Sequence, residues 1–207
     1  MQEGYKKIYI IGCGPGSREY LTLAAIDLVG GAGLVMGPQG LVSLFGPIAG
    51  RVVLTENKTS LVLEEMEKYF PEEDIVLLVG GDPGCYSLSR PVISRFGPEN
   101  CRVIPGISSV QLGLSRLGKE WTGARVLSAH GRDTSRLPGL ISGSDLCVVL
   151  LGGQLGWLGP FLSEITRDKT IYLMQDLGLQ AETISIINSN TDLEREISPK
   201  SLLVITV

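Results

Sequence analysis

Histidine is nearly absent from this sequence of 207 residues, in which His130 is the only one. A metal site built from several histidines is therefore excluded. The four cysteines form no Cys-x-x-Cys motif, and each lies in or beside an apolar stretch: Cys13, Cys85, Cys101 and Cys147. This spacing favours buried free thiols over disulfides or metal ligands, so no bound metal is expected.

Long apolar runs and a secretory signal are also lacking. No run approaches the roughly 20 apolar residues that a transmembrane helix needs, and the first residues, MQEGYKKIYIIG, contain no small-residue cleavage site. The composition is 43% hydrophobic with 27 glycines and 11 prolines, which separate apolar runs of strand length. We therefore expect a cytoplasmic α/β protein with a substantial core and no membrane partner.

Positive charge exceeds negative charge in one block of the sequence. The net charge is −4, yet residues 90–136 contain eight basic and three acidic residues, so this block carries +5 and the remainder −9. Each basic residue taken alone is typical of a solvated helix face. As a block they predict a surface for an anionic small molecule. Aromatic residues do not alternate with the basic ones, so no nucleic-acid partner is expected.

Apolar runs of strand length alternate with helical patterns, which predicts parallel βαβ units. Residues 59–70 show the helical period, with Leu63, Met66, Tyr69 and Phe70 on one face. The last two apolar runs are joined by a connection too short for a packed helix, which indicates a mixed sheet. The expected strands are 7–11, 33–36, 74–80, 101–106, 124–129, 145–151, 170–175, 182–188 and 201–207.

The pattern predicts two α/β lobes. Residues 1–116 form an N-terminal lobe with a mostly parallel sheet, and residues 117–207 form a C-terminal lobe with a mixed sheet. The segment LGKEWTG (117–123) is a plausible hinge, because an apolar helix pattern ends there and a new strand begins.

The turn GCGPG (12–16) follows the first strand and opens a helical pattern. A dinucleotide fingerprint needs a glycine where Ser17 stands and an acid at the end of the second strand, and a P-loop needs Gly-Lys-Ser/Thr. The glycine loop of Rossmann-like methyltransferases has an acid where Ile10 stands. Pro15 also removes one N–H donor that would bind an anion. A tight strand-to-helix turn is therefore favoured over a phosphate site.

The segment VGGDPGCYS (79–87) follows the most apolar strand. Gly80 and Gly81 place bare backbone at the carboxyl end of a parallel strand, where α/β sheets bind ligands. Asp82 is either an acceptor for a ribose or amine, or a turn residue before a helix that begins near Tyr86.

Two more motifs follow later strands. In IPGISSVQ (104–111), Ser108 or Ser109 is either a helix N-cap or a ligand contact, and Val110 excludes a nucleophile elbow. The segment SAHGRD (128–133) gathers the only histidine, an arginine and an aspartate within six residues.

The motifs GCGPG, GGDPGCYS, PGISSVQ and HGRD, in this order and spacing, resemble the tetrapyrrole methylase family over nearly the whole chain. HGRD is the most discriminating of them and is typical of the branch that methylates carbon 5 of cobalt-precorrin-7 in cobalamin biosynthesis. The resemblance implies a homodimer of two-lobed α/β chains. It also implies that S-adenosylmethionine binds in a cleft between the lobes and that the substrate is an anionic corrinoid.

The resemblance also implies site residues. Arg132 would pair with a substrate carboxylate in the bidentate geometry of arginine, and Tyr86 would contact the substrate. His130 would either accept the proton displaced at the methylated carbon or shape its loop through hydrogen bonds. The residues expected to contact the cofactor are Pro15, Gly80, Gly81, Asp82, Cys85, Ser108, Ser109 and Leu151.

Methyl transfer from a sulfonium is a single in-line displacement, so neither a metal nor a protein nucleophile is expected. Two alternatives stay open. One is a methyltransferase of the same family that acts on another precorrin position or on uroporphyrinogen. The other is a non-catalytic protein that binds a nucleoside or a tetrapyrrole.

Overall fold

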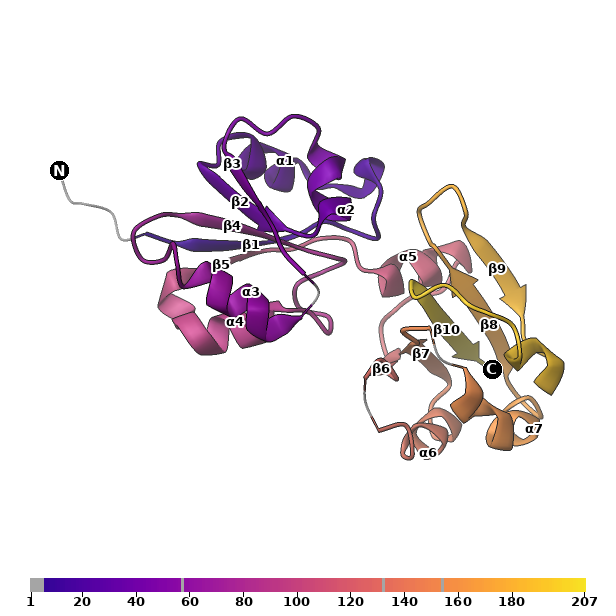
Figure 1. Ribbon diagram of the computed structural model, residues 1–207. Helices are drawn as coiled ribbons and strands as arrows, with labels where there is room; N and C mark the ends of the chain where they lie inside the picture. Colours follow the sequence, from indigo (N-terminus) through magenta and orange to yellow (C-terminus); the bar gives the residue numbers. More distant parts are fainter. Residues whose placement is uncertain (1–5, 57, 132, 154) are drawn as a thin grey trace. The chain divides into compact units, whose positions relative to one another are not determined.

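The computed structural model describes residues 6–56, 58–131, 133–153 and 155–207, and Figure 1 labels their helices and strands. The chain forms two compact units, Met1–Ser108 and Ser109–Val207. The division falls before helix α5 (Ser109–Arg116), whereas the sequence-based division falls after it. The reason is packing: Gly113 of α5 lies against Met174 and Leu202 of the second sheet.

The first unit contains a five-stranded parallel sheet with the strand order β3-β2-β4-β1-β5. All five residues of β4 are buried, as expected for a central parallel strand that is covered on both faces. The strands are β1 (Ile8–Gly12), β2 (Leu34–Gly37), β3 (Arg51–Leu54), β4 (Ile75–Val79) and β5 (Cys101–Ile104).

Helices cover both faces of this sheet (Figure 1). Val62, Met66 and Val92, from α3 and α4, pack against one face. Ala25 and Val29, from α1, pack with α2 against the other face. The first unit is therefore a three-layer α/β structure. Its helices are α1 (Leu23–Gly30), α2 (Gln39–Val42), α3 (Thr59–Met66) and α4 (Ser89–Phe96).

The second unit contains a mixed sheet with the strand order β6-β7-β10-β8-β9. The β6–β7 pair is parallel, and the other three pairs are antiparallel. Helices α6 (Leu137–Ser142) and α7 (Leu162–Ile165) contribute to the core on one face, and α5 covers the other. The strands are β6 (Arg125–Ser128), β7 (Leu146–Leu150), β8 (Thr170–Gln175), β9 (Thr183–Ile186) and β10 (Ser201–Thr206).

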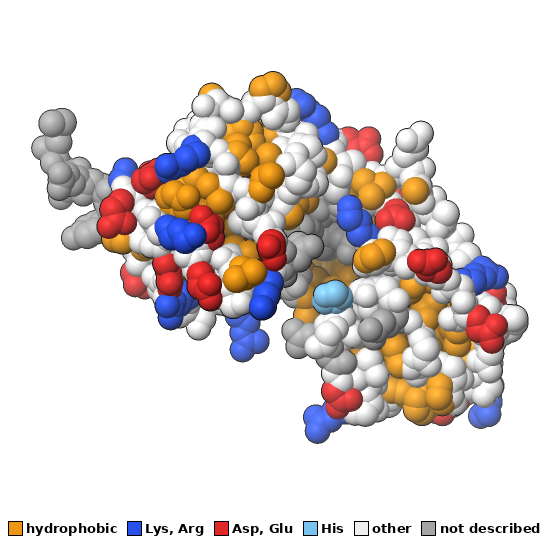
Figure 2. All heavy atoms as spheres, viewed as in Figure 1, with side chains coloured by type: hydrophobic (Ala, Val, Ile, Leu, Met, Phe, Trp, Pro, Cys, Tyr) orange, Lys and Arg blue, Asp and Glu red, His pale blue; other side chains and the backbone are white. Residues whose placement is uncertain are grey.

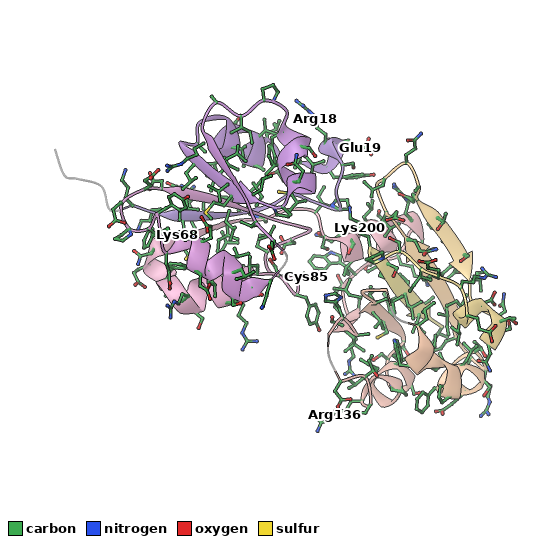
Figure 3. The ribbon with its side chains drawn as sticks, viewed as in Figure 1. Arg18, Glu19, Lys68, Cys85, Arg136 and Lys200 are labelled. Atoms are coloured by element: carbon green, nitrogen blue, oxygen red, sulfur yellow. The ribbon has the colours of Figure 1, made fainter. Side chains whose placement is uncertain are left out.

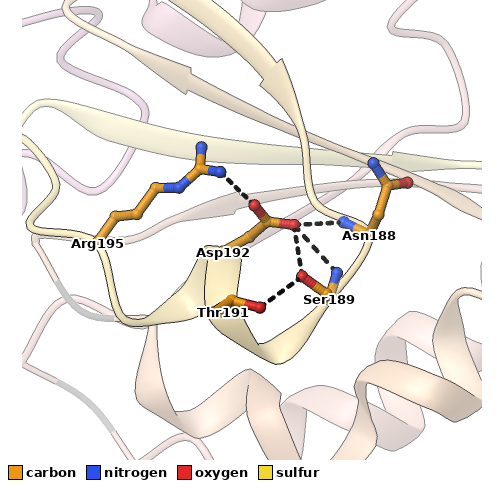
Figure 4. Close-up of polar contacts among 5 residues, drawn as sticks. All are labelled: Asn188, Ser189, Thr191, Asp192 and Arg195. Carbon is orange, nitrogen blue, oxygen red and sulfur yellow. Dashed lines mark hydrogen bonds and ion pairs between the residues drawn. The ribbon is translucent and has the colours of Figure 1, made fainter.

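The connection between β9 and β10 is organised by Asp192 (Figure 4). One carboxylate oxygen accepts hydrogen bonds from the backbone N–H groups of Asn188, at 3.0 Å, and Ser189, at 3.1 Å, and the other pairs with Arg195. These hydrogen bonds, led by that of Asn188, lower the pKa of Asp192. The connection contains one short 3-10 turn, Asn190–Leu193, and Ser189 and Asp192 form its capping box.

The α/β class and the mixed second sheet predicted from the sequence are confirmed. Strand β3, an edge strand of four largely exposed residues, was not predicted. Helix α3 ends at Met66, earlier than predicted, and Tyr69 and Phe70 pack against the core from the turn that follows.

The cysteines are free thiols, as predicted, although only Cys13 and Cys147 are fully buried. Burial raises the pKa of Cys13 to about 12 and that of Cys147 to about 11, so both are protonated and unreactive at neutral pH. In the described part of the chain, His, Cys, Asp and Glu form no group of three or more that could hold a metal ion. None of the described helices has the length and hydrophobicity to cross a membrane.

The basic block at residues 90–136 is divided between the two units. Arg95 pairs with Glu67, and the guanidinium of Arg116 donates to both oxygens of Glu182, at 2.6 and 3.1 Å. Both acidic partners lie outside the block, so counting charges along the sequence overstates its local positive charge. Figure 2 shows basic and acidic side chains interleaved on the visible face of the first unit, and Figure 3 labels Arg136, which precedes α6.

Candidate active site

Three of the four motifs meet at one edge of the first sheet. Strands β4, β1 and β5 are parallel neighbours, so their carboxyl ends lie side by side (Figure 1). GCGPG follows β1, GGDPG follows β4 and PGISS follows β5. The candidate site of the first unit is the group of these three turns.

Bare glycine backbone allows the three turns to touch. A Cβ atom on Gly12 would lie 2.6 Å from the Gly106 nitrogen and 2.7 Å from the Gly81 oxygen. A Cβ atom on Gly106 would lie 2.5 Å from the same Gly81 oxygen. Any larger residue at position 12 or 106 would push backbone against backbone, so these two glycines are required by close approach.

The GCGPG turn has little capacity left to bind a phosphate. Gly14 and Gly81 exchange two backbone hydrogen bonds, at 3.2 Å from the Gly14 nitrogen and 2.7 Å from the Gly81 nitrogen. The Cys13 nitrogen donates to the Val79 oxygen at 2.8 Å, and Pro15 has no N–H group. Two donors of the turn, the N–H groups of Cys13 and Gly14, are thus already used, and Pro15 supplies none.

Asp82 connects two of the three turns. Its Oδ1 atom accepts a hydrogen bond from the Gly84 nitrogen at 2.7 Å, and its Oδ2 atom accepts one from the Gly106 nitrogen at 3.1 Å. Both oxygens thus serve the turn role that the sequence analysis had left open. Contact with a ribose or amine through their remaining lone pairs stays a prediction.

Asp82→Asn is expected to lower the free energy of unfolding by about 1–3 kcal/mol, because the amide nitrogen would face one of the two N–H donors and leave it unpaired. Chemical denaturation measures the change. Glu64→Gln, on the exposed face of α3, removes the same charge and should leave the midpoint unchanged. Equal midpoints for the two variants would contradict the connecting role.

The segment after Asp82 is a loop, so the prediction that a helix begins near Tyr86 is wrong. Helix α4 begins at Ser89, and Tyr86 has a φ of 49° and a side chain that is 49% exposed. A tyrosine in the left-handed region is uncommon, and strained residues of this kind cluster at active sites and ligand-binding sites. Cys85, labelled in Figure 3, is half-buried, and this burial raises its pKa.

The third turn leads into α5. Ser108 is 7% exposed and immediately precedes the helix, in the position of an N-cap, whereas Ser109 is its first residue. Pro15, Gly80, Gly81, Asp82, Cys85, Tyr86 and Ser108 belong to the first unit, and the other predicted site residues belong to the second.

The fourth motif lies at an edge of the second sheet. Strands β6 and β7 are parallel, and the Ala129 nitrogen donates to the Leu150 oxygen at 2.8 Å where both strands end. His130 follows and is exposed. Arg132 lies outside the described residues. The side chain of Leu151 is fully buried in the core, so a contact with a ligand would be made through its carbonyl group.

Asp133 of the same motif is used within its own turn. Its oxygens accept hydrogen bonds from the Ser135 nitrogen at 2.9 Å and from the Ser135 hydroxyl at 2.8 Å. The backbone bond makes the larger contribution to lowering the pKa of Asp133.

Three glycines of the site, Gly12, Gly106 and Gly152, were not predicted as individual residues. The available signal was a glycine at the end of a strand, as in GCGPG, IPGIS and LGGQ.

Comparison with known proteins identifies the class to which this fold belongs. Residues 7–190 match the family model described as Tetrapyrrole (Corrin/Porphyrin) Methylases. The chain belongs to this family, whose members are S-adenosylmethionine-dependent methyltransferases.

Two related proteins are named for the methylation of cobalt-precorrin-7. A protein of Methanocaldococcus jannaschii called probable cobalt-precorrin-7 C(5)-methyltransferase is 32% identical over 191 residues, which cover 86% of this chain and 88% of that protein. The Salmonella typhimurium cobalt-precorrin-7 C(5)-methyltransferase is 30% identical over 127 residues, or 61% of this chain and 62% of that enzyme.

Solved structures confirm the fold. The precorrin-6Y methylase of Archaeoglobus fulgidus aligns with a TM-score of 0.77 at 20% identity and covers 98% of both chains. The uroporphyrin-III C-methyltransferase of Thermus thermophilus, solved as a complex with S-adenosyl homocysteine, aligns with a TM-score of 0.73 at 20% identity and covers 97% of both chains.

Proposed function

We propose that this protein transfers a methyl group from S-adenosylmethionine to carbon 5 of cobalt-precorrin-7, an anionic corrinoid of cobalamin biosynthesis. The observation that carries the proposal is the 32% identity to a protein named for this reaction, over 86% of the chain. The HGRD sequence at residues 130–133 supports the same branch.

The turns of the first unit fit a nucleoside cofactor. Gly80 is exposed, and a Cβ atom built on it would meet nothing within 4 Å, so bare backbone is accessible at the carboxyl end of β4. Asp82 beside it offers carboxylate lone pairs to hydroxyl or amino groups. We extend the proposal to the full set of cofactor contacts, namely Pro15, Gly80, Gly81, Asp82, Cys85, Ser108, Ser109 and Leu151.

When bound, the sulfonium cofactor supplies an electrophilic methyl group, and the carbon–sulfur electron pair leaves with the sulfur. The task of the protein is then to align donor and acceptor and to exclude water, which can lower the barrier by about 7–11 kcal/mol. The new carbon–carbon bond displaces a proton, and His130 accepts it as the general base. Tyr86 contacts the corrinoid.

Arg132 pairs with a peripheral carboxylate of the corrinoid in this proposal. Arg132→Ala is expected to raise the Michaelis constant for the corrinoid about tenfold or more, because a charge-assisted hydrogen bond contributes roughly 1.5–3 kcal/mol. The Michaelis constant for S-adenosylmethionine should stay the same in steady-state assays. Arg136→Ala, in the same segment, is the matched charge control. An unchanged corrinoid Michaelis constant for Arg132→Ala would exclude the carboxylate pair.

Calorimetric titration with S-adenosylmethionine tests cofactor binding, and a saturable heat with one site per chain is expected.

Separate incubations with other precorrins and with uroporphyrinogen test which substrate the protein methylates, because the same family includes enzymes for each. If the protein methylates one of these in preference to cobalt-precorrin-7, it is a methyltransferase with a different substrate from the one proposed.

The homodimer and the cytoplasmic location stay predictions. Sedimentation of the pure protein tests whether it is a homodimer.

A further inference from the structure

The imidazole of His130 lies directly on the backbone of Gly152. A Cβ atom built on Gly152 would lie 1.8 Å from Nδ1, 2.5 Å from Cγ and 2.8 Å from Cβ of His130. Each distance is shorter than real Cβ atoms show, and the two shortest involve ring atoms. The ring therefore occupies the space that any L side chain at position 152 would fill.

The two backbones that make this contact are fixed by the sheet. Ala129, just before His130, donates its N–H to the Leu150 oxygen at 2.8 Å. Leu151, just before Gly152, donates its N–H to the Ser201 oxygen at 3.0 Å. The nitrogen of His130 also donates to the Ser128 hydroxyl at 3.3 Å. These bonds anchor the residues just before His130 and Gly152 at the ends of β6, β7 and β10.

Gly152 is suited to this place for a second reason. Its φ is +61°, in the left-handed region that favours glycine. The residue that follows, Gly153, also has a left-handed φ of +87°, but a Cβ atom there would lie 3.8 Å from the Pro199 Cα atom, an ordinary contact. The two glycines thus share the backbone requirement, and Gly152 alone carries the contact with the ring.

We propose that Gly152 is a positioning residue, which holds the exposed imidazole of His130 in one orientation by offering it a surface without a side chain. The purpose of this orientation, aiming a ring nitrogen at the proton to be removed, rests on the proposed function. The contact itself does not, because it follows from the geometry of the second unit.

Nuclear magnetic resonance tests the contact directly. His130 is the only histidine, so in protein without a polyhistidine tag each ring proton gives one signal. A nuclear Overhauser effect from the ring Hε1 proton to the Gly152 α-protons is expected in the unmodified chain. Gly152→Ala should shift the ring signals, and Gly153→Ala should leave them in place. Absence of the Overhauser effect, or equal ring shifts in both variants, would overturn the proposal.

Enzyme kinetics tests whether the orientation of the His130 ring affects catalysis. Gly152→Ala is expected to lower kcat at least tenfold with the Michaelis constants unchanged, and Gly153→Ala to keep kcat within about twofold of the unmodified enzyme. In the His130→Ala background, Gly152→Ala should cause no further loss of kcat, because the ring it displaces is gone. Additive losses would overturn the positioning role. If the unmodified protein methylates no corrinoid, the proposed function fails, and the resonance data still decide the contact.

Discussion

Gly106→Ala is expected to destabilise the first unit by at least about 3 kcal/mol, at the upper end of what overpacking costs. The three closest atoms to the new methyl group are the Gly81 oxygen at 2.5 Å and the carbonyl carbon and oxygen of Gly12, both at 2.7 Å. All three belong to backbone, so no side chain can rotate away. The Gly106 N–H bond to Asp82 would also be strained.

Gly80→Ala is the matched control for this experiment. It lies at the same sheet edge, and a Cβ atom there meets nothing within 4 Å. The free energy of unfolding of Gly80→Ala should differ from that of the unmodified protein by less than about 1 kcal/mol. A small increase is expected, because alanine leaves the unfolded chain less conformational freedom than glycine does. Chemical denaturation followed by far-ultraviolet circular dichroism measures both variants.

Hydrogen exchange shows which strands Gly106→Ala destabilises. Faster exchange is expected in peptides from β1, β4 and β5, whose ends the three turns hold together. Both tryptophans, Trp121 and Trp157, belong to the second unit, so their fluorescence reports that unit alone. A denaturation midpoint for Gly106→Ala equal to that for Gly80→Ala would show that the three turns do not depend on bare backbone.

His130→Ala is expected to lower kcat by about 10²–10⁴, the usual contribution of a general base. Binding of S-adenosylmethionine should be unchanged. The fold should also be kept, because the hydrogen bonds of this segment, from the Ala129 nitrogen to Leu150 and from the His130 nitrogen to Ser128, are made by the backbone. The rate of S-adenosyl homocysteine formation with corrinoid substrate measures kcat.

His130→Gln separates a base from a residue that only shapes the loop. Glutamine keeps a hydrogen-bonding side chain but accepts no proton near neutral pH, so its kcat should fall as far as that of His130→Ala. Imidazole in the buffer should restore part of the activity of His130→Ala. Full turnover in His130→Ala, or recovery in His130→Gln, would contradict the general-base role.

The order of the elements could be predicted because the chain alternates strand-length apolar runs with helical periods. Strand β4 and its parallel neighbours are buried on both faces, so they read as continuous apolar segments. Strand β3, an edge strand whose exposed residues include Val52 and Leu54, was not predicted, although the exposed edge strands β5 and β9 were.

The site could be predicted as motifs but not as contacts. Local sequence places Asp82 in a turn, yet its bond to Gly106 joins residues 24 positions apart and depends on the order of the strands. Likewise, the glycine pair at 152 and 153 gives no sign of which glycine meets His130. That distinction arises from the strand pairing of the second sheet, which no short motif contains.

Incubation of the protein with cobalt-precorrin-7 and S-adenosylmethionine that carries a trideuterated methyl group tests the proposed methyl transfer. We expect a product heavier by one labelled methyl group, located at carbon 5 by nuclear magnetic resonance, with S-adenosyl homocysteine formed in equal amount. An unmodified corrinoid, or a label on any other carbon, would contradict the proposal.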